Sequence, residues 1–501
     1  MSNETPEDAR RRITEELLEH ERHSYRLKTE WNTYTPISKI PDEILIEILE
    51  AARKLLIYSA WYQLLGVCSH WRNVAVGKLT WWQRPPTHEH GLTLVMLQRT
   101  KNSVVDVEIT NRTSLTTVVD LCNHIGRFRV LDIQQSETPS LRRTLECLLD
   151  SHQEFSRLEA LSIWSQISGT ESLDIPAIPF HQSRTVHTIQ FININFDWNM
   201  FPCPNLTALI LLNNHHTRQI PADHLLLILS QMPNLKNIQL DVDPILLRDI
   251  PVSSNSVVRL PLLLRLELRA VPVSLAQYLL SHLRLPSLKV IAISFLQSPE
   301  RAYSNHSGIE QAVSSIIRNG NSGLLNRLSV DYDGFQIEQD WDTRTVWGDQ
   351  TEIGFYNLLG HNTSANTLLH FKFMHSILRR LHQLTLGCDV SLDLFVLLQL
   401  CEIMISVEKI VVAGGPTALP TLIKAFEARQ SPDMLFPELK TIQLENYDFD
   451  DNIEILQALC DILIKRKEYG LPVHKVYVPE CDISRDNLNR LREIVEDVHR
   501  R

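Results

Sequence analysis

Two close pairs of histidines are the residues whose type and spacing could bind a metal ion. His88 and His90 form the first pair, and His215 and His216 form the second. A structural zinc site needs further cysteine, histidine or acidic ligands at regular short spacings, and neither pair has them nearby. The acidic run at 448–451 likewise lacks the glycine and the final glutamate of a calcium loop. We therefore interpret the histidines as surface residues and the acidic run as a loop that leads into a helix.

Local motifs for catalysis are missing from the sequence. The chain has no phosphate-binding loop, no nucleophile elbow, no dinucleotide-binding fingerprint and no zinc-protease motif. Its 16 glycines among 501 residues leave little for loops that cradle a phosphate. The pair Gly414 and Gly415 more simply indicates a turn after a strand. We expect no catalytic residue, no metal and no cofactor, so the protein is predicted not to be an enzyme.

Composition and charge are typical of a soluble globular protein. The 49 Lys and Arg residues against 59 Asp and Glu give a formal net charge of −10, so a nucleic-acid partner is not expected. No apolar run is long enough to span a bilayer, and no membrane partner is expected. The 8 cysteines are widely spread without a close pair, and we interpret them as reduced core thiols. These features predict a cytoplasmic or nuclear location, or both, and the short basic run at 465–467 does not distinguish them.

A six-residue phrase, apolar-x-x-apolar-x-apolar, recurs along most of the chain from residue 104 onward. Each phrase is typical of a short strand, and the segments between phrases have the apolar spacing of helices. One strand and one helix cannot bury their own apolar faces, so such units stack on one another. The phrases begin at Val104, Phe128, Leu158, Val186, Leu206, Leu235, Leu263, Leu288, Leu325, Leu381, Val407, Leu439 and Val473.

The repeated phrase predicts an α/β fold, an irregular leucine-rich repeat solenoid with parallel strands on its concave side and helices on its convex side. The alternative is an ordinary α/β domain, whose buried strands would also be short and apolar. A proline that precedes four of the phrases, at Pro204, Pro233, Pro286 and Pro437, favours the repeats. The asparagine or cysteine expected at the ninth position is found only as Asn214, so the repeats are degenerate.

Two segments interrupt or end this rhythm. Residues 331–380 are predicted to be an insertion that loops from one face, either a binding loop containing Trp341 and Trp347 or a surface excursion. Residues 483–501 are predicted to form a helix that caps the last repeat. Its apolar face would consist of Leu488, Leu491, Ile494, Val495 and Val498.

The solvent-facing side of the strands is where a partner would bind. In each phrase the fifth and seventh residues should point out of the concave sheet, because side chains alternate along a strand. Most of these positions are polar. An apolar cluster at such positions marks a binding surface or a covered one, and we hypothesise that it contacts a protein substrate whose identity the sequence does not specify. The cluster consists of Trp164, Ile192, Ile210 and Leu212.

A heptad pattern near the N-terminus predicts a helix over residues 10–31. This stretch contains neither glycine nor proline, and its seam residues recur at alternating spacings of four and three. Because two of the six seam residues are polar, we expect the helix to lie against the next module and not to form a stable coiled coil alone. The seam residues are Ile13, Leu17, His20, Ser24, Leu27 and Trp31.

Two apolar stripes follow within residues 36–75. The first begins after a proline and two acidic residues that suit a helix start, and the second ends before two tryptophans and two prolines. The stripes contain Ile44, Leu45, Ile48 and Leu49, then Leu64, Cys68, Trp71 and Ala75. Together they resemble an F-box, most similar to the large F-box families of mushroom-forming fungi. A module of this size buries too little surface to be very stable alone, so it should bind a partner.

The resemblance implies a three-helix F-box that binds a Skp-type adaptor and, through it, a cullin. For Leu64 and Trp71 an interface role and a core role are equally open, whereas Pro41 and Ile44 favour the interface. The adaptor-binding residues implied by the first part of the motif are Ile40, Pro41, Glu43, Ile44, Leu45 and Ile48. Those implied by the second part are Leu64, Val67, Cys68 and Trp71.

The sequence thus predicts four consecutive parts: a heptad-like helix at 1–34, an F-box at 35–84, a repeat solenoid at 85–482 and a capping helix at 483–501. We expect the chain to be the substrate-recognition subunit of a Skp-cullin-F-box ubiquitin ligase. The alternative is an F-box scaffold or regulatory protein that acts outside ubiquitin transfer.

Overall fold

The computed structural model divides into two compact units, residues 1–160 and 161–501, which are described separately. The structure describes residues 5–56, 61–151, 154–165, 185–201, 203–214, 217–245, 257–295, 312–313, 325–331, 334–339, 352–357, 374–387, 393–415, 417–429 and 434–500. His215, His216, Trp341 and Trp347 therefore lie outside the described residues.

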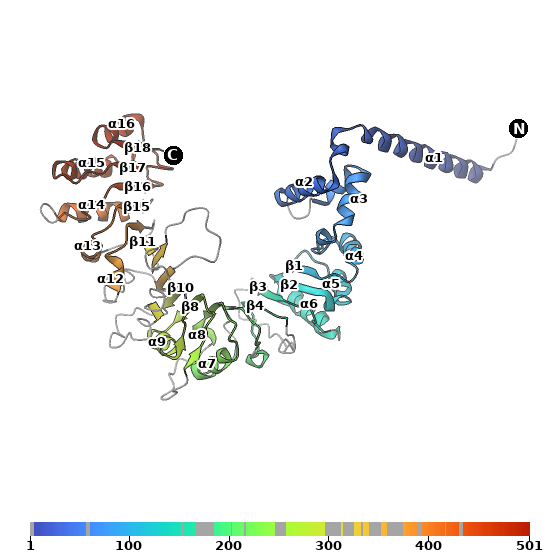
Figure 1. Ribbon diagram of the computed structural model, residues 1–501, viewed down its shortest axis with the longest axis horizontal. Coiled ribbons are helices and arrows are strands. Elements are labelled where there is room, and N and C mark those ends of the chain that lie inside the picture. The colour runs from blue at the N-terminus through green and yellow to red at the C-terminus, as the bar shows by residue number, and fades with distance from the viewer. Residues whose placement is uncertain are drawn as a thin grey trace. The chain divides into compact units, whose positions relative to one another are not determined.

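The first unit begins with a long helix, α1 (Pro6–Thr33), shown in blue in Figure 1. The Thr5 side chain caps it by accepting a hydrogen bond from the Asp8 backbone N–H at 3.2 Å. The helix predicted over 10–31 is confirmed, but its predicted packing against the next module is wrong. None of its residues is buried, and the side chain of Trp31 is 75% exposed.

A group of short helices follows and shares one hydrophobic core. Leu45, Leu49, Ala75, Trp81, Trp82 and Met96 form its buried centre. The indole N–H of Trp82 donates to the Ala75 carbonyl at 3.2 Å, so the largest buried side chain is also satisfied. The elements are η1 (Pro36–Lys39), α2 (Asp42–Leu55), η2 (Trp61–Gly66), α3 (Ser69–Gly77), η3 (Leu79–Trp82) and α4 (His90–Arg99).

The rest of the first unit contains two parallel strands and their helices. Strands β1 (Val105–Thr110) and β2 (Phe128–Gln135) pair in parallel. The segment 83–87 runs beside β1, since the Asp106 N–H donates to the Gln83 carbonyl at 2.7 Å. This hydrogen bond joins the helical group to the edge of the strand pair. The helical elements here are α5 (Leu115–Cys122), η4 (Ile125–Arg127) and α6 (Thr138–Asp150).

The second unit is a long sheet of mostly parallel strands. Its strands follow one another in the order β3, β4, β5, β6, β8, β10, β13, β12, β11, β14, β15, β16, β17 and β18. They are β3 (Ala160–Ser165), β4 (Thr188–Ile192), β5 (Ala208–Leu212), β6 (Asn237–Asp241), β8 (Arg265–Val271), β10 (Val290–Phe295), β11 (Leu325–Asp331), β12 (Gly334–Gln339), β13 (Glu352–Asn357), β14 (Gln383–Leu386), β15 (Lys409–Ala413), β16 (Thr441–Glu445), β17 (Lys475–Tyr477) and β18 (Asp497–His499). All thirteen phrases of the sequence therefore coincide with strands of one unit or the other.

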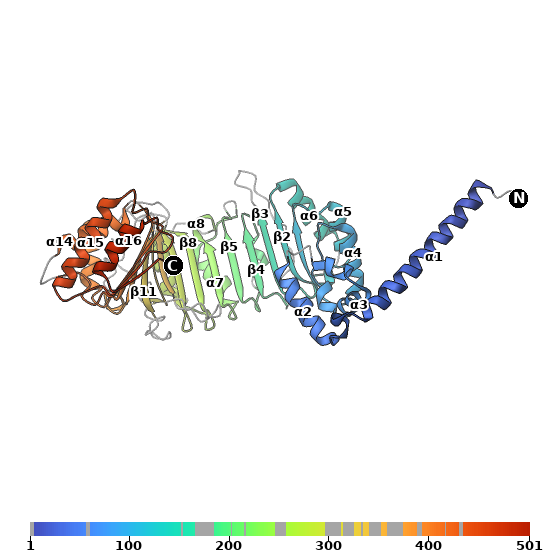
Figure 2. The same ribbon diagram turned by 90° about the horizontal axis from the view of Figure 1, so that it is seen from above.

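Described helices lie between many of the successive strands of the second unit. A separate small pair, β7 (Val258–Arg259) with β9 (Leu283–Arg284), lies outside the main sheet. Figure 2 shows β4, β5 and β8 as strands of one sheet, in which β6 lies between β5 and β8. The helical elements are η6 (Trp198–Met200), α7 (Ala222–Ser230), α8 (Val242–Ile245), α9 (Val273–His282), α12 (His375–Leu378), α13 (Leu394–Ile403), α14 (Ala418–Ala428), α15 (Ile453–Glu468) and α16 (Arg485–Ile494). This alternation of mostly parallel strands with helices is compatible with a solenoid of the leucine-rich-repeat type.

The segment 331–380 differs from the predicted looping insertion. Strands β12 and β13 lie within the main sheet, where β12 is antiparallel to both β11 and β13. Strand β13 then pairs in parallel with β10. The insertion therefore contributes two strands to the sheet, and one of them, β12, runs opposite to both of its neighbours. An apolar phrase of the repeat type could not indicate this reversal.

The turns after the strands use the ninth position of the repeat more than once. The Asn214 Oδ1 accepts a hydrogen bond from the Ile194 backbone N–H at 3.2 Å, so the asparagine at the ninth position of its phrase holds the preceding turn. The prediction that Asn214 is the only such residue is wrong, because Cys481 is the ninth residue of the phrase that begins at Val473. Its thiol donates to the Leu444 carbonyl at 3.2 Å and accepts from the Tyr447 N–H at 3.4 Å.

The C-terminal helix is shorter than predicted. Helix α16 ends at Ile494, and Val498 lies in β18, which pairs in parallel with β17.

In helix α15, Arg466 is fully buried and donates from Nη1 and Nη2 to the carbonyls of Leu435 and Phe436, each at 2.8 Å. Burial lowers the pKa of Arg466 to about 10. The basic run at 465–467 is thus partly a structural element of the core.

Candidate binding surfaces

Helix α2 carries apolar residues on more of its circumference than the core covers. At 3.6 residues per turn, Ile48 and Leu55 lie within about 40° of Ile44 around the helix axis. Leu45 and Leu49 lie roughly 100° to 140° away from Ile44 on the side that faces the core. Ile44 is 46% exposed, whereas Leu45 is completely buried. We call Ile44, Ile48 and Leu55 the α2 strip.

The structure separates the ten predicted adaptor-binding residues into two groups. Leu45 belongs to the buried centre of the core and cannot contact a partner in this conformation, so its assignment to an interface is corrected. Ile40, Leu64 and Trp71 are partly buried and pack against the same core. Cys68 caps α3 by accepting the Trp71 N–H at 3.5 Å. For Leu64 and Trp71, packing against the core is therefore the role that the contacts support.

The remaining five predicted residues are exposed: Pro41, Glu43, Ile44, Ile48 and Val67. Pro41 is the N-cap residue of α2, and Glu43 lies in the first turn, where its charge suits the helix dipole. The exposed Leu55 was not predicted, although its spacing of seven residues from Ile48 is a signal that could have identified it.

The predicted apolar cluster on the strands is present in the second unit. Ile192 is directly opposite Leu212 in the register of β4 and β5, and Ile210 lies two residues before Leu212 on the same face. The Asn193 side chain donates to the Ser165 carbonyl at 2.6 Å, which holds the ends of β3 and β4 together. Trp164 lies on β3, the neighbour of β4 in the sheet, and all four side chains are half-buried. We call these four residues the strand patch.

Charged residues lie two and three strands from Ile192 on the same face of the sheet. Glu267 on β8 accepts from Arg269 at 2.6 Å and contacts Arg265 at 3.3 Å. Asp241 on β6 is opposite Arg269 in the register. Asp241 and Glu267 are buried, contrary to the expectation that every such position is exposed. The strand patch is therefore bordered on one side by paired charges.

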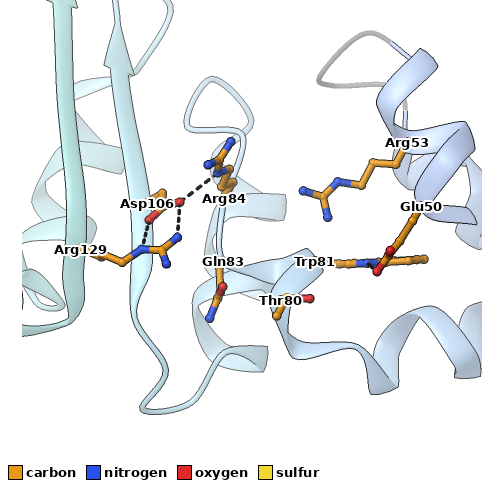
Figure 3. A pocket seen from close by; sticks show the side chains of 8 residues that line it. All are labelled: Glu50, Arg53, Thr80, Trp81, Gln83, Arg84, Asp106 and Arg129. Atoms are coloured by element: carbon orange, nitrogen blue, oxygen red, sulfur yellow. Dashed lines mark hydrogen bonds and ion pairs between the residues drawn. The ribbon is translucent and has the colours of Figure 1, made fainter. Parts of the chain in front are cut away.

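A third feature is a cavity in the first unit that is lined mainly by charged and polar residues, with a volume of about 470 Å³. It is lined by Glu50, Arg53, Thr80, Trp81, Gln83, Arg84, Asp106 and Arg129 (Figure 3). No sequence motif indicates this cavity, because its residues come from separate elements.

Asp106 holds two arginines at one wall of this cavity. Its Oδ2 accepts from Arg84 Nε at 2.9 Å and from Arg129 Nη2 at 2.8 Å, while its Oδ1 accepts from Arg129 Nε at 2.9 Å. Burial alone would raise the pKa of Asp106, but the hydrogen bonds and charges of Arg129 and Arg84 outweigh it and lower that pKa below its ordinary value. The carboxylate therefore stays ionised at neutral pH and fixes both guanidinium groups.

The seven described cysteines are free thiols. Burial raises the pKa of Cys122 and of Cys203 to about 11, so these thiols are poor nucleophiles at neutral pH. Among the described residues, no group of three or more histidine, cysteine or acidic side chains could hold a metal ion. None of the described helices combines the length and the hydropathy that crossing a bilayer requires.

Solved structures that match this chain include two with low sequence identity. One is the crystal structure of a TLR13–ssRNA13 complex, with 12% sequence identity and a TM-score of 0.32, over 80% of this chain and 45% of that chain. The other is a protein from Bacteroides fragilis, with 10% identity and a TM-score of 0.22, over 71% of this chain and 68% of that chain. The chain thus spans less than half the length of the first. No family model and no curated protein matches the sequence.

Proposed function

We propose that the protein is a non-catalytic adaptor, the substrate-recognition subunit of a Skp-cullin-F-box ubiquitin ligase. Residues 35–84 would act as the F-box and bind a Skp-type adaptor, and the repeat strands would hold a target protein. The transfer chemistry would take place on other subunits, so the contribution of this chain would be proximity.

The observation that supports this proposal best is the α2 strip. Three large apolar side chains are exposed along one side of a helix whose opposite side is fixed by a buried core. A rigid helix that exposes an apolar strip is suited to pack into a groove of a partner protein. Such a contact would stabilise a module that is too small to bury all of its apolar surface.

The strand patch supports the second half of the proposal. Trp164, Ile192, Ile210 and Leu212 lie on adjacent strands, about 4.8 Å apart. Tryptophan and large aliphatic residues at the centre of an interface contribute most of its binding energy. We propose that this patch binds an apolar side chain or a short apolar segment of the target.

The experiment is affinity purification of the full chain with a Skp-type adaptor, comparing Ile44→Asp with Ile453→Asp. Both isoleucines lie in the first turn of a helix and are about equally exposed, at 46% and 50%, but Ile453 is in α15 of the second unit. Ile44→Asp should weaken adaptor binding at least roughly 30-fold, as for the loss of a hot spot of about 2 kcal/mol. Ile453→Asp should bind as the unmodified chain does.

Equal adaptor binding by both variants would contradict the proposed docking face. If the adaptor complex forms but contains no cullin, and no bound protein gains ubiquitin, the chain would act as a scaffold outside ubiquitin transfer.

A further inference from the structure

The arginine-lined cavity of the first unit has the size and the side chains of a small binding site. Its volume of about 470 Å³ lies within the range of typical ligand pockets. One wall is made by the second half of α2 and by η3, and the other by segment 83–84 with strands β1 and β2. A group bound there would contact both the helical part and the strand part of this unit.

Positive charge exceeds negative charge around this cavity. Three arginines line it, Arg53, Arg84 and Arg129, against the two acids Glu50 and Asp106. Both acids are already engaged by neighbouring groups. Asp106 accepts from two of the arginines, and Glu50 accepts from the Trp81 indole N–H at 3.4 Å and contacts Lys78 Nζ at 3.6 Å.

Arg84 is fixed in place but retains donors. Its Nε bonds to the buried Asp106 carboxylate, while its side chain remains 53% exposed. Within the described part of the chain, its two Nη groups make no hydrogen bond. Figure 3 shows the Arg53 side chain reaching from α2 toward the side of the cavity that Arg84 occupies. An arginine that a buried carboxylate orients loses little entropy when it binds an anion, which favours a bidentate contact.

We propose that this cavity binds an oxyanion, a phosphate or carboxylate group, through the Nη groups of Arg84 with Arg53 opposite. The side chains of Thr80 and Gln83 supply neutral hydrogen-bonding groups at its rim. The oxyanion could belong to a small free anion or to a phosphorylated or acidic side chain of a bound protein, since both present the same group to the arginines. This site is independent of the adaptor and target surfaces proposed above.

The test uses the full chain and inorganic phosphate, titrated at constant ionic strength with sodium chloride as the balancing salt. Calorimetric binding and the melting temperature are both recorded. Phosphate should bind with saturation and raise the melting temperature, whereas chloride at equal ionic strength should not. Arg84→Gln should weaken phosphate binding roughly 10-fold or more, as expected for the loss of a charge-assisted hydrogen bond.

Two further variants keep the result interpretable. Arg112→Gln removes an exposed arginine of the same unit that is not among the residues lining the cavity, and it should leave phosphate binding unchanged. Arg84→Lys keeps the charge and the contact to Asp106 but loses the planar fork, so its affinity should lie between those of the unmodified chain and Arg84→Gln. Folding of each variant is checked by circular dichroism and by its unchanged adaptor binding.

The source of the oxyanion is decided by a second titration with a phosphoserine peptide. Tighter binding of the peptide than of inorganic phosphate would assign the site to a partner's side chain, and equal or weaker binding would assign it to a free anion. The proposal is overturned if neither probe binds, or if Arg84→Gln and Arg84→Lys bind phosphate as well as the unmodified chain does. Neither result would change the proposed adaptor contact, because Ile44 and Arg84 are tested by different ligands.

Discussion

The α2 strip and the strand patch both place apolar side chains at the surface, but they do so with different backbone periodicities. In α2, Ile44 is exposed and its neighbour Leu45 is fully buried, although the two point only about 100° apart. In β5, Ile210 faces outward and Leu211 is buried on the opposite side of the strand. Along β5, half-buried and buried residues therefore alternate strictly, whereas around α2 the exposure changes gradually from one side of the helix to the other.

This difference explains which site residues the sequence could place. The alternation along a strand fixed the outward direction of Trp164, Ile192, Ile210 and Leu212 without further information. On α2, the apolar residues form one broad face, and only the packing partners decide which part of that face is covered. Leu45 was therefore assigned to the interface when it belongs to the core.

The largest difference in stability loss is expected between substitutions of the two neighbouring residues Ile44 and Leu45 on α2. Leu45→Ala should reduce the local free energy of unfolding by about 2–5 kcal/mol, because it leaves a cavity in the buried core. Ile44→Ala should change it by about 0.5 kcal/mol or less, as for an ordinary surface substitution. Amide hydrogen exchange in peptides from α2 and α3 of the full chain measures both. Similar losses for the two variants would show that the α2 strip is covered.

A smaller loss of local stability is expected from a substitution in the turns that follow β4 and β5, next to the strand patch. Asn214→Ala removes the acceptor for the Ile194 N–H, which should cost about 1–3 kcal/mol of local stability. Exchange should quicken at the ends of β4 and β5, next to Ile192 and Leu212. Asn213→Gly is the control, because Asn213 is exposed and has a φ of 54° that glycine adopts easily. Equal effects of the two variants would mean that the turn does not depend on the Asn214 side chain.

Other features could not be predicted because their residues share no local pattern. Arg84 and Arg129 lie 22 and 23 residues from Asp106 in the sequence. The pairing of β1 with β2 brings Arg129 to Asp106, and the position of segment 83–87 beside β1 brings Arg84 there. The strands β12 and β13 do not follow the repeat phrase, so nothing in the spacing indicated that they enter the sheet. The heptad pattern predicted the helix α1 correctly, but such a pattern does not indicate which residues, if any, pack against the apolar seam. Cys481, in contrast, could have been predicted from the sequence, because it is the ninth residue of its repeat phrase.

The smallest expected effect concerns the ion pairs that join the helical group of the first unit to its strands. The pKa of Asp106 is lower in the folded chain than its ordinary value of 3.8. A lowered folded pKa means that the charge of Asp106 stabilises the fold fully above that ordinary value and stops doing so as the pH falls through the lower, folded value. Asp106→Asn lacks this charge at every pH.

The difference in melting temperature between the unmodified chain and Asp106→Asn should therefore be constant from pH 7 down to about pH 5 and should narrow below the ordinary pKa. Asp451→Asn, at an exposed aspartate of the second unit, should show no such change. A difference that widens on acidification would mean that burial outweighs Arg84 and Arg129, so that the folded pKa is raised. A charged carboxylate would then not hold the two arginines, and only the apolar core would fix the position of α2.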